Sequence, residues 1–419
     1  MLGTALDFLR VFSLARPQLP TVDSIAPLYD TIFSFGDSYT TIGYDPNQGI
    51  NVVPDVGGTS SGGNSWPQFL ATADSNRSIA LYDFAVGGAA TNNSALYFAG
   101  QEVSIPDFPQ QVATFEDFFS NPDGTAIKSG EAAWRPERTL FTVFFGINDV
   151  GLEVRNQEDP RAELPQIFGE LATTSFLHHR VHHWMSTARG RAQSGVAQNE
   201  VFITKLKKSF SMLITSPILS CPATWSRMIV KLYASGARNF LILNIPPTQR
   251  TPFISALPER ILAMYESDLN GYNVVLSDFV RTIEPAYNGT RVIFFDAHAV
   301  FDEILDKYAD YGFTDNSTFC ELYASIATQP ALDLPQCGRP LAQYVWWNSG
   351  HPTWPVHQIL ASRIAAALLA NASTTASSDV PKLSSNETTV PLGKSIRTAS
   401  NLLLASALAA AIATRLNAT

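Results

Sequence analysis

The sequence predicts a three-layer α/β/α sandwich around a central, mainly parallel five-stranded sheet. Two observations lead to this fold class. Five short apolar runs have the length of buried strands, and helix-like stretches separate them. Strands that alternate with helices form βαβ units, whose right-handed crossovers make the sheet parallel and cover both of its faces. The predicted strands are residues 31–35, 79–86, 139–145, 239–245 and 291–296.

The helix-like stretches complete this pattern. The chain of 419 residues is 45% hydrophobic and 16% charged, which is enough for one large core or two smaller ones. Parallel sheets of this type bind their ligands at the carboxyl ends of the strands, so we look for function there. The predicted helices are residues 65–73, 110–119, 226–236, 259–283 and 355–370.

We expect the sandwich to occupy residues 28–370, after an N-terminal extension at 1–27. The apolar stretch of that extension is interrupted by Asp7 and Arg10, so a degraded signal peptide and a cytosolic start are both open. Residues 371–400 are rich in Ser and Thr and should form a disordered linker.

The apolar tail at 401–419 has two interpretations. Its apolar stretch, residues 402–414, is shorter than the roughly 20 residues that a membrane span needs. A polar spacer followed by a short apolar tail resembles a GPI-attachment signal, which would anchor the protein at a membrane; a terminal helix is the alternative.

Residues 171–222 do not fit the βα pattern. They carry six basic residues against one acidic residue, and they include four of the seven histidines. His178 and His182 share a helix face, but no carboxylate lies nearby to support a metal site. We interpret the segment as a solvated basic insertion or as sequence that is not native coding sequence.

The formal net charge of −9 argues against nucleic acid as a partner. No Cys/His spacing typical of a metal site occurs, and we expect no metal and no cofactor. Cys320 and Cys337 bracket one loop and should pair in an oxidising compartment, which leaves Cys221 as the odd cysteine.

Seven N-glycosylation sequons favour the secretory route and a secreted or cell-surface location. They are at Asn76, Asn92, Asn288, Asn316, Asn371, Asn386 and Asn417.

Four short blocks point to one chemistry. Gly36-Asp37-Ser38 ends the first strand, Gly87-Gly88 follows the second, Asn148 follows the third, and His351 lies in a late loop before a helix. Each has an ordinary structural explanation as a turn, a cap or a helix start. Together they supply a nucleophile, oxyanion donors and a base, which is the set that acyl transfer requires.

These blocks, in this order, resemble the SGNH/GDSL hydrolases. The neighbouring phrases "FSFGDSYTTIGYDP", "FAVGGAATNN" and "GARNFLILNIPP" are similar to fungal carbohydrate esterase family 16, the acetylesterases. The resemblance implies that Ser38 is the nucleophile and His351 the general base. It also implies an oxyanion hole made of the Ser38 N–H, the Gly88 N–H (with Gly87 as the alternative) and the Asn148 side chain.

One position departs from the family pattern. Members usually carry an acidic residue three before the histidine, where this chain has Asn348. An amide oxygen can accept from the histidine Nδ1–H, but it lacks the charge that stabilises imidazolium. The sequence therefore leaves open a working Ser-His-Asn triad, a weakened one and an inactive one.

Other polar residues near the blocks have structural interpretations. We interpret Asp37 and Asp149 as structural, and Asp296, which precedes His298, as a helix cap. Aromatic residues beside the blocks are candidates for stacking on sugar rings, although core packing explains some of them equally well. They are Tyr39, Tyr44, Trp66, Trp346 and Trp347.

The sequence thus predicts a serine esterase that removes small acyl groups, with acetyl as the first candidate, from carbohydrate. Two alternatives remain. One is a lipid or long-chain ester hydrolase on the same fold, and the other is a non-catalytic, glycosylated carbohydrate-binding surface protein. The substitution at Asn348 favours the latter, and the intact Ser38, Asn148 and His351 oppose it.

Overall fold

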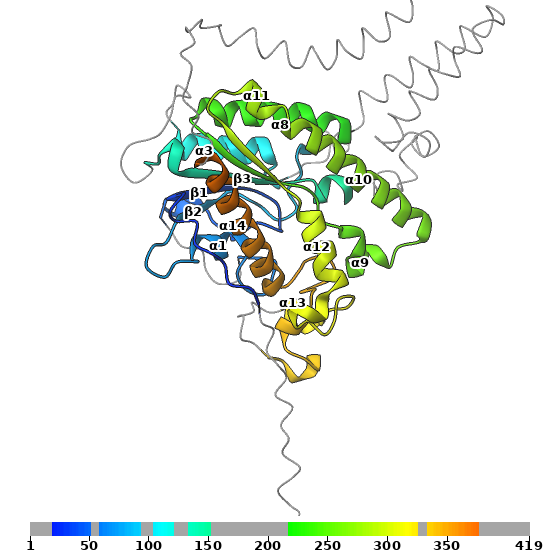
Figure 1. Cartoon of the computed structure of the whole chain (residues 1–419). Coiled ribbons are helices and arrows are strands. Elements are labelled where there is room, and N and C mark those ends of the chain that lie inside the picture. Colours follow the sequence, from blue (N-terminus) through cyan, green and yellow to red (C-terminus); the bar gives the residue numbers. More distant parts are fainter. Residues whose placement is uncertain are drawn as a thin grey trace, which may run out of the picture.

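The computed structural model describes residues 19–51, 58–93, 104–120, 133–151, 217–325 and 333–376. Within these ranges five strands form one sheet in which every neighbouring pair is parallel. Their order across the sheet is β2-β1-β3-β4-β5 (Figure 1). The strands are β1 (Thr31–Gly36), β2 (Ala80–Asp83), β3 (Thr139–Phe144), β4 (Asn239–Leu243) and β5 (Arg291–Phe295).

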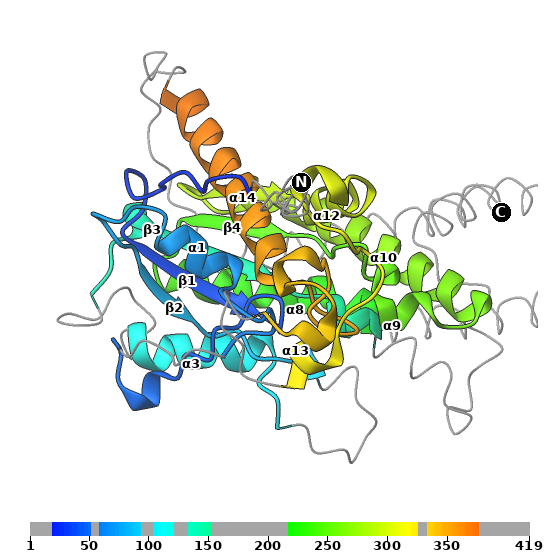
Figure 2. The same ribbon diagram turned by 90° about the horizontal axis from the view of Figure 1, so that it is seen from below.

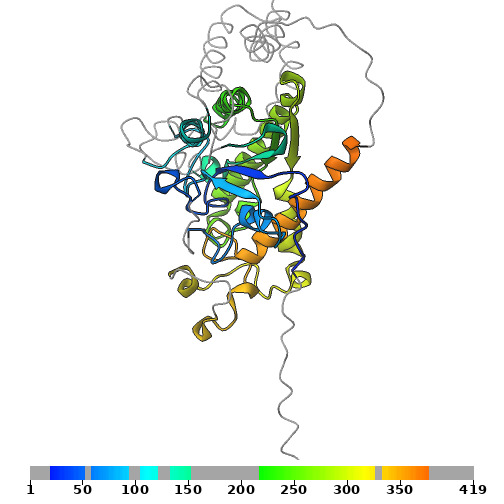
Figure 3. The same cartoon turned by 90° about the vertical axis from the view of Figure 1, so that its left-hand side faces the viewer.

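Helices cover both faces of the sheet, which confirms the predicted α/β fold class. Successive side chains of β1 point to opposite faces of the sheet, since Phe33 packs into one core cluster and Ile32 into the other. Figures 2 and 3 show the sheet between these layers, with α8 on one side and α14 on the other. One layer holds α3 (Phe108–Phe119), α8 (Pro217–Ala234), α10 (Glu259–Val280) and α11 (Ile283–Ala286), and the other holds α1 (Trp66–Ala71), α12 (Ala297–Asp306) and α14 (Trp354–Ala376). Two short helices, α9 (Pro252–Ser255) and α13 (Glu321–Ser325), lie in the connections.

Helix α3 shows how local sequence sets these elements. Asp107 caps its amino end by accepting from the backbone N–H of Gln110, and the Gln110 side chain accepts in return from the Asp107 N–H. Its apolar residues recur at helical spacing, so that one face of the helix is buried against the sheet.

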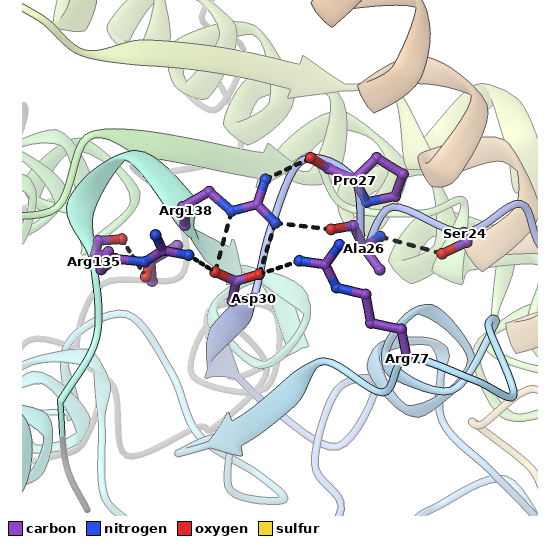
Figure 4. A network of polar contacts seen from close by, with 8 residues as sticks. Ser24, Ala26, Pro27, Asp30, Arg77, Arg135 and Arg138 are labelled. Atoms are coloured by element: carbon purple, nitrogen blue, oxygen red, sulfur yellow. Dashed lines mark hydrogen bonds and ion pairs between the residues drawn. The ribbon is translucent and has the colours of Figure 1, made fainter. Parts of the chain in front are cut away.

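An ion-pair network joins the starts of three strands at the amino edge of the sheet (Figure 4). Asp30, just before β1, accepts from Arg77 before β2 at 2.7 Å and from Arg138 before β3 at 2.7 and 3.1 Å. Arg135 donates to the same carboxylate, and Arg138 also donates to the Ala26 carbonyl. These hydrogen bonds, that of Arg138 first, hold the pKa of Asp30 well below its usual range.

The structure differs from the predicted domain boundaries in three places. Ile25 and Ala26 are buried and the Gln358 side chain donates to the Pro20 carbonyl at 3.1 Å, so the packed domain includes the described part of the 1–27 extension.

Helix α14 continues to Ala376, which makes residues 371–376 of the predicted linker helical, because adding a turn to an existing helix costs little. Helix α8 begins at Pro217, so the last residues of the 171–222 segment, Cys221 among them, belong to it. The rest of that segment (171–216, with His178 and His182) lies outside the described residues, as do residues 1–18 and the tail from 377.

Candidate active site

The end of β1 is fixed tightly beneath the candidate nucleophile. A Cβ atom at Gly36 would lie 2.8 Å from the Phe144 carbonyl oxygen and 2.9 Å from Thr40 Oγ1, so only glycine fits there. The buried Gln111 of α3 accepts from the Gly36 N–H at 3.0 Å and donates to the Gly36 carbonyl at 2.8 Å. Sequence reasoning missed Gln111. Its signal is a polar residue on the buried face of α3, between Phe108 and Phe115.

Asp37 shapes the turn that follows. Its Oδ1 accepts from the Tyr39 N–H at 2.9 Å, and its backbone carbonyl accepts from the N–H groups of Thr40 and Thr41 at 3.0 Å each. The carboxyl group is fully buried, and burial, aided by the nearby Asp149, raises its pKa to about 7. Asp149 is also buried and accepts from the Thr91 N–H at 3.0 and 3.1 Å. Both carboxyl groups accept hydrogen bonds from backbone N–H groups, in agreement with the structural interpretation.

Ser38, His351 and Asn348 form one hydrogen-bonded chain. Ser38 Oγ lies 2.8 Å from His351 Nε2, and His351 Nδ1 lies 2.9 Å from Asn348 Oδ1. The serine follows β1, whereas the other two residues belong to the loop before α14. The fold thus brings the three predicted residues together in the order that nucleophilic catalysis requires.

Two backbone N–H groups fix the orientation of the Asn348 amide. Its Oδ1 accepts from the N–H of Gly350 at 2.9 Å and from the N–H of His351 at 2.8 Å. Backbone N–H groups only donate, so the atom that faces them must be the amide oxygen rather than the NH₂ group. The same oxygen therefore accepts from His351 Nδ1–H, and Nε2 keeps its lone pair for the Ser38 hydroxyl proton.

Three more hydrogen bonds hold the histidine loop. The Tyr39 hydroxyl donates to the Gly350 carbonyl at 2.6 Å, the Trp347 N–H to the His351 carbonyl at 2.8 Å, and the Phe253 N–H to the Ser349 carbonyl at 2.8 Å. Burial lowers the pKa of His351 to about 4, so the imidazole is a free base at neutral pH.

A second histidine, His357, is the fourth residue of α14. It is fully buried, and burial followed by repulsion from His351 lowers its pKa to about 3. Both ring nitrogens are without a hydrogen-bond partner among the described residues. His357 is therefore a neutral core residue, and it makes folding sensitive to acid.

The predicted oxyanion donors come together from the ends of β2 and β3. Gly88 has a φ of +82°, which favours glycine. A Cβ atom at Gly87 would lie 3.8 Å from the Ser38 Cβ, so this turn passes directly over the serine. The Asn148 side chain donates to the Ala89 carbonyl at 2.9 Å, which ties the end of β3 to the same turn.

Several other predicted features have clear positions. Asp296 caps α12 by accepting from the Ala299 N–H at 3.0 Å, which confirms the cap interpretation. His298 Nδ1 lies 3.0 Å from the Ile245 carbonyl oxygen. In the part of the chain that the structure describes, no cluster of His, Cys, Asp and Glu could hold a metal ion. None of the helices in the same ranges is both long and apolar enough for a membrane span.

Of the five aromatic candidates for sugar stacking, Tyr39, Trp66 and Trp346 are buried in the core. The ring of Tyr44 packs against Tyr82 and Phe84. Trp347 is the candidate that lies beside His351 and keeps a partly exposed ring.

Cys320 and Cys337 form a disulfide with a Cα–Cα distance of 5.6 Å. Among the sequons, Asn76 and Asn288 are exposed, whereas the side chains of Asn92 and Asn316 donate to Thr224 Oγ1 and to the Leu305 carbonyl. Asn371 is half-buried in α14, and Asn386 and Asn417 lie outside the described residues.

Comparison with known proteins adds to this geometry. A family model described as GDSL-like Lipase/Acylhydrolase matches residues 32–364. An acetylesterase of Thermothelomyces thermophilus is 25% identical over 348 residues, which cover 80% of this chain and 87% of that protein. A GDSL esterase/lipase of Arabidopsis thaliana is 23% identical over 311 residues (71% and 70%), and a thermolabile hemolysin of Vibrio parahaemolyticus is 22% identical over 320 residues (73% and 55%).

Proposed function

Since the chain belongs to the GDSL-like lipase/acylhydrolase family and is a carboxylic ester hydrolase, we propose that it removes acetyl groups from carbohydrate through an acyl-enzyme on Ser38. The observation that carries the proposal is the chain of hydrogen bonds from Ser38 Oγ through His351 to Asn348. The direction of these hydrogen bonds is set by Asn348, which turns its amide oxygen toward His351 Nδ1. Nδ1 then carries the proton, and Nε2 is left to accept the proton of Ser38.

Acylation proceeds as follows. Ser38 Oγ attacks the acyl carbon while its proton moves to His351 Nε2, and the carbonyl electron pair moves onto the carbonyl oxygen. The N–H groups of Ser38 and Gly88 and the Asn148 side chain donate to this oxyanion. The imidazolium then gives its proton to the alcohol oxygen as the C–O bond breaks.

Deacylation repeats these steps with water. His351 takes a proton from a water molecule that attacks the acyl carbon, and then returns that proton to Ser38 Oγ as acetic acid leaves and later ionises in solution. Asn348 holds the Nδ1–H proton throughout, but as a neutral group it stabilises the imidazolium less than a carboxylate would.

The choice of substrate rests on two supports. The acetylesterase relative spans most of the chain, and the sequence phrases around the blocks resemble acetylesterases of carbohydrate. Esters of long-chain acids are the competing substrates, and the assay must separate the two classes.

The test compares 4-nitrophenyl acetate with the octanoate, using wild type and Ser38→Ala. We expect acetate to be preferred and Ser38→Ala to lose nearly all activity with an unchanged circular dichroism spectrum, since removing a triad nucleophile costs about 10⁶ in kcat. Wild-type-like hydrolysis by Ser38→Ala would remove the nucleophile assignment. A preference for octanoate would replace acetyl esters by long-chain esters.

We also propose that the protein works on the secretory route or at the cell surface. The Cys320–Cys337 disulfide and the exposed sequons at Asn76 and Asn288 support this location. Expression in a eukaryotic secretory host, followed by peptide-N-glycosidase treatment, tests it: a mass loss at Asn76 or Asn288 is expected, and unmodified protein retained in the cytosol contradicts it.

A further inference from the structure

Trp347 lies directly beside the candidate base. Its indole ring and the His351 imidazole are 6.4 Å apart between centroids and inclined by 66°. Its backbone N–H donates to the His351 carbonyl at 2.8 Å, so a backbone hydrogen bond also joins the two residues. Trp347 as a residue is only partly buried, in contrast to Trp346 next to it, which is 1% exposed.

A small disulfide-linked lobe holds the ring from one side. Trp347 Nε1 donates to the Tyr323 carbonyl at 3.0 Å, which fixes the edge of the indole. The ring packs against a cluster that contains Tyr323, Tyr344 and both half-cystines, Cys320 and Cys337.

Hydrogen bonds within this lobe make it a firm support. The Tyr323 hydroxyl donates to the Arg339 carbonyl at 3.0 Å and accepts from the Leu334 N–H at 3.0 Å. The Tyr344 hydroxyl donates to the Cys337 carbonyl at 2.7 Å. An aromatic ring held in this way loses little conformational freedom when it binds a ligand.

The chemistry of the site tells which part of the substrate meets this ring. The oxyanion donors Gly88 and Asn148 follow β2 and β3, whereas His351 comes from the loop before α14. The imidazolium gives its proton to the leaving alcohol oxygen, so the alcohol must lie on the His351 side of Ser38. Trp347 is a partly exposed aromatic residue next to His351, with 6.4 Å between the two ring centroids.

We infer that Trp347 is the platform for the leaving alcohol, and that it selects a ring-shaped alcohol, a pyranose, over a small open-chain one. This inference rests on the proposed function. The flat face of an indole ring complements the C–H face of a pyranose, and the disulfide lobe acts as a positioning element that keeps the face in place.

The experiment uses esters that share the acetyl group and differ in the alcohol: xylose tetraacetate, phenyl acetate and ethyl acetate. For Trp347→Ala we expect kcat/KM on the xylose ester to fall about tenfold, mainly through KM, while ethyl acetate changes by less than about threefold. Trp347→Phe keeps a ring and should recover most of the loss. Tyr233→Ala, on α8 beside the exposed Asn288, is the matched control and should change neither ester.

Reduction of the Cys320–Cys337 disulfide should act in the same selective direction as Trp347→Ala, because the lobe then holds the indole less firmly. An equal loss on the xylose ester and ethyl acetate would overturn the inference, since it would mean that Trp347 only positions His351. No change on either ester would also overturn it. A larger loss on phenyl acetate than on the xylose ester would replace the pyranose by an aryl alcohol. Ethyl acetate hydrolysis that depends on Ser38 tests the proposed function separately from all these outcomes.

Discussion

Replacement of Asn348 by Asp tests the most unusual feature of the site, its uncharged partner for the base. The two side chains have the same shape, and Oδ1 would keep its three donors: the N–H groups of Gly350 and His351 and the His351 Nδ1–H. The change therefore adds one negative charge about 3 Å from the imidazole and leaves the geometry in place.

The charge should affect both the pKa of His351 and the rate. Two opposite charges about 4 Å apart interact by about 4 kcal/mol at an effective dielectric constant of about 20. Since Asn348 is half-buried, solvent reduces this to about 2 kcal/mol, which raises the pKa of His351 by about 1–2 units from its value of about 4. The same energy stabilises the imidazolium formed in the transition state, so kcat/KM at neutral pH should be held or raised, by up to about 10²-fold.

The pH dependence of kcat/KM shows in which direction the pKa of His351 moves. His351 acts only as a free base, so the wild-type rate falls as the pH drops through about 4, and the variant rate should begin to fall at about 5–6. We would measure kcat/KM for 4-nitrophenyl acetate from about pH 3 to about pH 9. Asn288→Asp, an exposed site that makes the same charge change, is the control and should leave the profile unmoved. A tenfold or greater fall of kcat/KM with an unmoved pKa would show that Asn348 is not the partner of His351.

Further predictions concern the support of the site and the stability of the fold. Gln111→Leu removes both hydrogen bonds to Gly36 and leaves a buried N–H unpaired, so it should cost about 2–3 kcal/mol of unfolding free energy and lower kcat more than it raises KM; unchanged stability in urea would refute the anchoring role. His357 has a pKa of about 3 in the folded state and 6.5 in the unfolded state. As the pH falls below 6.5 the unfolded state takes up a proton first, so the free energy of unfolding decreases from pH 6.5 down to about pH 3. His357→Leu should therefore remove about 3 kcal/mol of the stability loss between pH 7 and pH 4, and an equally steep loss in the variant would contradict this. Asp30 has a folded pKa well below its unfolded value, so Asp30→Asn should cost about 1–2 kcal/mol of unfolding free energy at neutral pH. This cost should begin to shrink as the pH falls below the unfolded value of 3.8 and should vanish only as the pH falls through the folded pKa; a pH-independent cost would exclude the ion pairs as its source. Deletion of 171–216 should preserve folding, whereas deletion of 171–222 should lower Tm because it shortens α8; aggregation of the shorter deletion would show that the segment belongs to the core.

The sheet was predictable because its strands are nearly all apolar, as buried parallel strands must be. The residues at which the strands end were harder to predict. The predicted second strand runs to residue 86, whereas β2 ends at Asp83. The backbone nevertheless continues to pair, since the N–H groups of Phe84 and Val86 donate to the carbonyls of Ser34 and Gly36. Apolar periodicity therefore locates this strand along the chain but does not fix the residue at which its regular pairing ends.

The candidate triad could be named from sequence, but its working geometry could not. Nothing in the letters around Asn348 shows that two backbone N–H groups turn its oxygen toward His351. The aromatic residues give the same lesson. Trp346 and Trp347 are neighbours in sequence, yet one is buried with its Nε1 donating to the Asn316 carbonyl and the other keeps a partly exposed ring. Exposure depends on packing between distant segments, which a local pattern does not contain.

The hydrogen bond between Ser38 and His351 joins residues 313 positions apart, and the one from Tyr39 to the Gly350 carbonyl spans 311. A ribosome therefore releases the nucleophile early and the base almost at the end of the packed domain. Until α14 docks onto the sheet, Ser38 has no base to take its proton. A chain that terminates before His351 therefore carries a serine hydroxyl that is not activated. Ester cleavage in this protein consequently requires both ends of the packed domain to be in place, and its first appearance during refolding would time the docking of the His351 loop against the end of β1.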